Sequence, residues 1–143
     1  MEIKSFADLN RHLFFGDEKK ASFEEVVKEI KEFTPAKEKL GNEYCYQLNL
    51  HGWLKRTFPS TVIEEQNGPS RPDIVIDNIA IEIKGPTGKK ELDTIANKAM
   101  NYLQDFKGGL IVVLFELNVD PQYYQNWLER LKKYFPNVVV IVK

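Results

Sequence analysis

The chain has 143 residues, of which 43% are hydrophobic and 29% charged, and its formal net charge at pH 7 is −1. These values predict one globular domain with a single core, and they exclude nucleic-acid binding through an overall basic excess, so such a ligand would need local positive charge or bound cations. No apolar run approaches the roughly 20 residues that span a bilayer, and the first 15 residues lack a secretory pattern, so we expect a cytoplasmic protein with no membrane partner. The single Cys45 can form no internal disulfide, and its apolar helical setting predicts a buried thiol.

Helical patterns fill the first part of the chain. A short first helix is predicted over residues 5–15, and Ser22 with Glu25 forms a capping-box pattern that begins a second helix. Thr34 has the character of an N-cap because a proline, common in the first helical turn, follows it. We therefore predict a third helix over Pro35–Phe58, which ends before the next proline.

The rest of the chain alternates short apolar runs with helical patterns. Residues 72–84 (PDIVIDNIAIEIK) predict a hairpin of two strands joined by a turn at Asp77-Asn78. The other predicted elements are a strand over 61–65, a helix over 91–106, a strand over 110–117, a helix over 121–135 and a strand over 138–142.

This element order predicts an α/β fold with a mixed central sheet. An antiparallel hairpin comes first, parallel strand–helix–strand units follow it, and helices flank the sheet. We expect a single domain over residues 1–143, in which residues 1–34 form a helical extension and residues 35–143 the core.

The predicted hairpin separates its residues by type. With a two-residue turn at 77–78, Asp73 lies directly opposite Glu82, and alternation places both on one side together with Lys84. The opposite side then consists only of isoleucine, at positions 74, 76, 79, 81 and 83. Such an apolar side is expected to face the core.

Two opposed acids at this position do not favour folding. Directly opposed residues have Cβ atoms only about 5 Å apart, where like charges are destabilising. A divalent cation between Asp73 and Glu82 would reverse the sign of that interaction, since hard cations prefer oxygen ligands. An ammonium group such as that of Lys84 beside a metal can orient a water molecule or offset charge on a phosphoryl group. The alternative is a solvated strand face, which commonly carries Asp, Glu and Lys.

Pro72-Asp73, followed after a short hairpin by Glu82-Ile83-Lys84, resembles the PD-(D/E)xK phosphodiesterases of the restriction-endonuclease-like superfamily. The resemblance extends from about Glu43 to Glu116. It implies a restriction-endonuclease-like fold in which Asp73, Glu82 and Glu43 hold Mg²⁺ or Mn²⁺, with the main-chain carbonyl of Ile83 as a further ligand. It also implies that Lys84 activates water or stabilises charge.

The helix after this motif departs from a common pattern of the family. Many relatives have a glutamine there with a tyrosine four residues later, whereas this chain has Lys98 followed by Tyr102. By the resemblance both are candidates for binding substrate. Lys89 and Lys90, in the loop before the helix, are further candidates for phosphate contacts, although an ordinary solvated connection explains them equally well.

Other candidates compete with these residues. Glu38 is an alternative to Glu43 as the acid of the leading helix, and His51 extends the polar face that Glu43 and Gln47 share. The aromatic residues of the predicted helices are expected in the core or at an interface rather than as base-stacking platforms; they are Trp53, Trp127, Tyr123 and Tyr124.

Two functions fit the sequence. The first is a metal-dependent nuclease, an endo- or exodeoxyribonuclease, that hydrolyses phosphodiester bonds in DNA. The second is a catalytically inactive module with a nuclease fold that binds nucleic acid or serves as a scaffold. The resemblance also leaves a homodimer open, because many relatives work as dimers.

Overall fold

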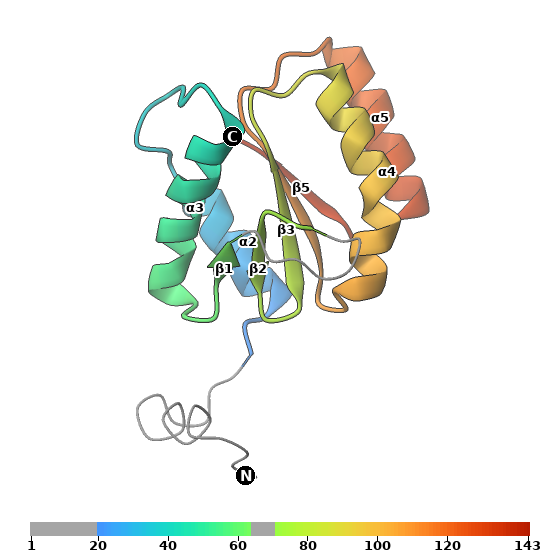
Figure 1. Cartoon of the computed structure of the whole chain (residues 1–143). Coiled ribbons are helices and arrows are strands. Elements are labelled where there is room, and N and C mark those ends of the chain that lie inside the picture. The colour runs from blue at the N-terminus through green and yellow to red at the C-terminus, as the bar shows by residue number, and fades with distance from the viewer. Residues whose placement is uncertain (1–19, 64–70) are drawn as a thin grey trace, which may run out of the picture.

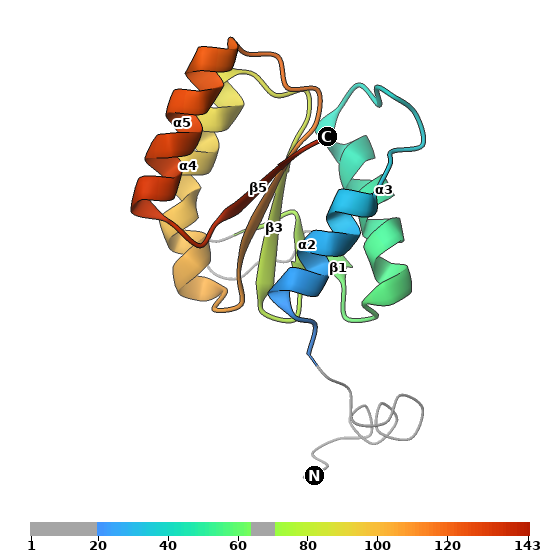
Figure 2. The same ribbon diagram turned by 180° about the vertical axis from the view of Figure 1, so that it is seen from behind.

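The structure, a computed structural model, describes residues 20–63 and 71–143. Within these ranges four helices and five strands form three layers, with the sheet between two pairs of helices (Figure 1). The helices are α2 (Phe23–Glu32), α3 (Glu43–Thr57), α4 (Lys89–Asp105) and α5 (Pro121–Tyr134). One pair, α2 and α3, covers one face, whereas α4 and α5 cover the other, as the view from behind also shows (Figure 2). No helix of the described residues is long and apolar enough to cross a membrane.

The central sheet is mixed. Its strands are β1 (Val62–Ile63), β2 (Ile74–Ile76), β3 (Ile79–Lys84), β4 (Gly109–Leu114) and β5 (Val139–Val142), and they lie side by side in chain order. The first three strands pair antiparallel, and β3, β4 and β5 pair parallel. The predicted α/β class, the leading hairpin and the parallel units that follow it are therefore confirmed.

The hairpin has the predicted register. Ile76 pairs with Ile79 across the turn, and Ile74 pairs with Ile81. The five isoleucines lie in one hydrophobic core with residues of α2 and α3. Val75 and Ala80, on the opposite side, are buried against residues of α4 and α5. Both sides of the hairpin are thus covered, and the charged residues lie at one end of a buried surface.

The predicted start of the third helix is wrong. Residues 33–42 are irregular, and the helix begins at Glu43 with Asn42 as its N-cap, whose side chain accepts a hydrogen bond from the Cys45 N–H. Gly41 has a φ of +85°, a conformation that interrupts a helix and suits glycine. The proline signal at position 35 was therefore outweighed by a second capping signal seven residues later. Cys45 is half-buried rather than buried.

Smaller differences concern the ends of elements. α4 begins at Lys89, two residues earlier than predicted, because the Gly88 N–H is bonded to the Glu91 carboxylate at 2.8 Å. β4 ends at Leu114 rather than at residue 117. The predicted capping role of Ser22 is confirmed, and Asp120 is the N-cap of α5. The helix predicted over 5–15 and the end of the strand predicted over 61–65 lie outside the described residues.

Candidate active site

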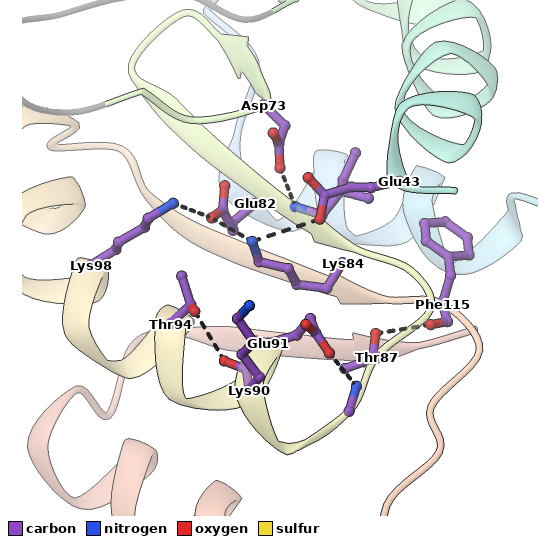
Figure 3. A network of polar contacts seen from close by, with 12 residues as sticks. Glu43, Asp73, Glu82, Lys84, Thr87, Lys90, Glu91, Thr94, Lys98 and Phe115 are labelled. Carbon is purple, nitrogen blue, oxygen red and sulfur yellow. Dashed lines mark hydrogen bonds and ion pairs between the residues drawn. The ribbon is translucent and has the colours of Figure 1, made fainter. Parts of the chain in front are cut away.

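Four charged side chains from three segments gather at the end of the hairpin that lies away from its turn. Asp73 precedes β2, Glu82 and Lys84 lie on β3, and Glu43 begins α3. Figure 3 shows the ammonium group of Lys84 between the carboxylates of Glu82 and Glu43, with Asp73 above them. The structure therefore brings together the residues that the sequence predicted as catalytic.

Glu82 is the most buried of these groups, with 2% of its surface exposed. The hydroxyl of Tyr102 lies 3.4 Å from its Oε1. Its Oε2 has no hydrogen-bond partner, although two ammonium groups lie at ion-pair distance, Lys98 Nζ at 3.6 Å and Lys84 Nζ at 3.8 Å. A buried carboxylate oxygen is normally hydrogen-bonded, so the charge of Glu82 is only partly compensated.

Asp73 is fixed from two sides. The Ile83 N–H donates a hydrogen bond of 2.7 Å to its Oδ2, and the Gln47 amide donates one of 3.2 Å to its carbonyl oxygen. Burial raises the pKa of the Asp73 carboxyl to about 8, and the adjacent Glu82 carboxylate contributes to this shift. Hence the Glu82 carboxylate lies close enough to Asp73 to oppose the ionisation of Asp73, as the hairpin register predicted.

Glu43 approaches from the other side of the site. Its Oε1 lies 3.6 Å from Lys84 Nζ, and its side chain is 41% exposed. Partial burial and the charge of Asp73 raise the pKa of Glu43, whereas Lys84 lowers it. This electrostatic coupling to Asp73 and Lys84 places Glu43 within the same site. Glu38, the competing candidate, lies exposed in the irregular segment before α3.

A close contact beside the site holds α3 against the sheet. A Cβ atom on Gly85 would lie 2.7 Å from the ring of Tyr46 and 2.9 Å from Phe115, so only glycine fits after Lys84. Tyr46 stacks on Phe115 with ring centroids 4.2 Å apart, and its hydroxyl donates a hydrogen bond to Glu116. Because Tyr46 is in the same helical turn as Glu43, this packing positions the acid.

The donor set suits a hard divalent cation. The three carboxylates come from separate segments and supply oxygen, which Mg²⁺ and Mn²⁺ prefer. The unpartnered Oε2 of Glu82 is an atom that such an ion would satisfy. As the side chains stand, no group of three or more His, Cys, Asp or Glu within residues 20–63 and 71–143 is arranged to hold a metal.

The other predicted site residues lie at different distances from the acids. Lys98 contacts Glu82 directly. Tyr102 is 3% exposed, and its hydroxyl lies within hydrogen-bond distance of both the Arg71 carbonyl, at 3.2 Å, and Glu82 Oε1, at 3.4 Å. Burial together with the Glu82 charge raises the pKa of this hydroxyl. Lys89 lies over the ring of Tyr123 at 4.7 Å, and Lys90 is exposed at the start of α4.

The main chain of Ile83 and the two tryptophans were also the subject of predictions. The main-chain N–H of Ile83 holds Asp73, which is a different contact from the carbonyl ligation that the resemblance implies. Trp127 is buried and its indole N–H donates to the Leu92 carbonyl, as expected for a core residue. Trp53 is half-buried, and its indole donates to the Glu29 carbonyl.

Two further residues near the site, Gln47 and Tyr46, were not predicted as site residues. Gln47 is 2% exposed and supports Asp73, and its spacing of four residues from Glu43 already placed it on the same helical face. The bond from Tyr46 to Glu116 joins residues 70 positions apart, and no local pattern indicates it.

Comparison of the chain with protein-family models, with curated proteins and with solved structures finds no match.

Proposed function

We propose that this protein is a divalent-metal-dependent nuclease that hydrolyses phosphodiester bonds in DNA, with a restriction-endonuclease-like fold and a PD-(D/E)xK site. One observation carries the proposal. Asp73 and Glu82 lie together beside Lys84, and the innermost acid has a buried oxygen without a hydrogen-bond partner. The two lysines at ion-pair distance compensate this arrangement only in part, and a divalent cation would complete the compensation.

Each residue has a distinct role in the proposal. Glu43, Asp73 and Glu82 hold Mg²⁺ or Mn²⁺, which supplies a Lewis acid when bound. Lys84 directs its ammonium group toward the phosphate, where it orients the attacking water or stabilises negative charge. Tyr102 stays protonated and orients Glu82 through its hydroxyl.

DNA is the proposed substrate because lysines lie beside the acids of this site, although the net charge of the chain is −1. Lys84 and Lys98 lie against the acids, and Lys90 is exposed at the start of α4, the helix that carries Lys98. Local cations of this kind suit contacts to a phosphate backbone. The proposal includes a cytoplasmic location, and a second copy of the chain as a partner.

Cleavage of mixed single- and double-stranded DNA tests the proposal. We expect products with Mg²⁺ or Mn²⁺, none after EDTA is added, and none from Asp73→Ala. Glu43→Gln should reduce the rate, whereas Glu38→Gln is the matched control and should not. Metal-dependent cleavage that survives Asp73→Ala would remove these residues from the mechanism.

A second function, binding without turnover, is favoured by the two lysines that already lie against Glu82. In that case the ammonium groups are permanent partners of the carboxylate and no ion is needed. Calorimetry with Mn²⁺ separates the two functions, because a binding module of this type gives no heat above that of dilution.

A further inference from the structure

Two ammonium groups approach the same carboxylate oxygen in this site. Lys84 Nζ and Lys98 Nζ lie 3.8 Å and 3.6 Å from Glu82 Oε2, and both distances are longer than a hydrogen bond (Figure 3). The oxygen is buried and has no hydrogen-bond partner. It is therefore shared by two cations without being fully satisfied by either.

The two lysines differ in how firmly they are held. Lys84 extends from a central strand, its side chain is 12% exposed, and it also contacts Glu43 at 3.6 Å. Lys98 extends from α4, its side chain is 45% exposed, and Glu82 is the anion it contacts. If one ammonium group leaves Glu82, Lys98 loses fewer ion-pair contacts than Lys84 would, and it can turn directly into water.

The charge balance of the site also favours the departure of Lys98 rather than of Lys84 when an ion binds. With a divalent ion bound and all three acids ionised, Glu43, Asp73 and Glu82 would carry −3, and Lys84 together with the ion would carry +3. The site is then neutral without Lys98. An ion bound to Glu82 Oε2 at about 2.0–2.6 Å would lie within about 6 Å of Lys98 Nζ, where the two cations repel each other.

We propose that Lys98 is a resident competitor of the metal, which neutralises Glu82 in the empty site and moves into solvent when a divalent ion binds. Lys98 thus lowers the affinity for the ion and stabilises the metal-free protein. The inference rests on the proposed metal site, and it assigns Lys98 a function that does not require contact with substrate.

Calorimetric titration with Mn²⁺ alone tests the competition without any nuclease assay. We expect Lys98→Met and Lys98→Gln to bind Mn²⁺ about fivefold more tightly than the natural chain, the size of a partly exposed ion pair of about 1 kcal/mol. Lys133→Met removes the same charge from the exposed side of α5 and should leave the affinity unchanged. Lys98→Arg keeps the charge and should bind Mn²⁺ like the natural chain.

Thermal unfolding gives a second readout. Without metal, Lys98→Met should melt below the natural chain, and its melting temperature should rise more when saturating Mn²⁺ is added. Far-ultraviolet circular dichroism confirms that the variants are folded, and Lys98→Gln carries the comparison if the methionine variant is not. The double variant Asp73→Ala with Lys98→Met should lose the tight binding, which shows that the ion occupies this site.

The results distinguish failure of this inference from failure of the proposed nuclease. If the natural chain binds Mn²⁺ and Lys98→Met binds it equally or more weakly, the competition is refuted and the metal site stands. If no chain binds Mn²⁺, both ideas are refuted. If only the Lys98 variants bind it, the lysine excludes the ion completely, which is the strongest form of the competition.

Discussion

Replacing Asp73 by asparagine should make the metal-free protein more stable at alkaline pH. Asparagine keeps an oxygen that accepts the Ile83 N–H but cannot ionise beside Glu82. The folded-state pKa of Asp73, about 8, is above the value of 3.8 for a free aspartate. The neutral carboxyl is therefore favoured by the fold, and its contribution to stability decreases as the pH rises from about 4 to about 8.

The size of the effect follows from that shift. One pKa unit corresponds to about 1.4 kcal/mol, so four units set a ceiling of about 6 kcal/mol. Asp73 is partly exposed, and its carboxylate can turn toward water once charged. We therefore expect ionised Asp73 to lower the free energy of unfolding by about 2 kcal/mol. For a domain of this size that is about 8 °C in melting temperature.

Thermal unfolding between pH 5 and pH 9 in EDTA measures the difference. The natural chain and Asp73→Asn should differ least at the acidic end of this range, and the variant should melt about 8 °C higher at pH 9. Asp77→Asn makes the same substitution at the turn, where asparagine also tolerates the φ of 52°. Saturating Mg²⁺ should reverse the order at pH 9. A difference that does not grow with pH would refute the placement of Asp73 beside Glu82.

Three further predictions test other parts of the structure. Gly85→Ala should lower the free energy of unfolding by about 2 kcal/mol in denaturant titrations, because the new methyl group overlaps Tyr46, whereas Gly52→Ala, which meets nothing within 4 Å, should raise it by about 0.5–1 kcal/mol. Lys84→Met should lower the rate of DNA cleavage at least about 100-fold and still bind Mn²⁺ in calorimetry. Tyr102→Phe should lower the free energy of unfolding of the metal-free protein by about 1–2 kcal/mol in denaturant titrations. The substitution removes the only hydroxyl that contacts Glu82 among the described residues. Equal unfolding free energies for the two glycine variants, or unchanged stability of Tyr102→Phe, would contradict the packing described above.

The hairpin was predictable because its determinants are local. A two-residue turn fixes the register, and alternation then assigns each side chain between Asp73 and Lys84 to one or the other face of the sheet. A shift of one residue would have moved the isoleucines out of the core. The positions of Asp73 and Glu82 were therefore determined by the same pattern that determined the fold.

The start of α3 was not predictable from the same kind of signal. Thr34-Pro35 and Gly41-Asn42 are both plausible beginnings of a helix, and the choice depends on contacts from outside the segment. The Leu40 N–H is bonded to the hydroxyl of Tyr46, and the Ala36 N–H to the side chain of Asn49. These bonds replace the helical ones and hold residues 36–40 against α3.

The contact between Lys98 and Glu82 could not be predicted from the sequence either. Spacing placed Lys98 on the helix after the motif, and a role in binding substrate followed from the resemblance. Which way a long, half-exposed side chain points depends on the packing of α4 against the sheet. The same limit applies to Gly85, whose need for a small residue arises from Tyr46, 39 positions earlier in the chain.

The burial of Glu82 has a consequence for any attempt to improve this protein by directed evolution. Apolar residues at position 82 and at its partner Lys98 would remove an ion pair whose acid is buried and only partly compensated, a replacement that is often neutral or stabilising in other proteins. A library screened for heat resistance alone should therefore accumulate apolar residues at these two positions. Libraries screened for the proposed DNA cleavage should keep the acid and gain their stability elsewhere.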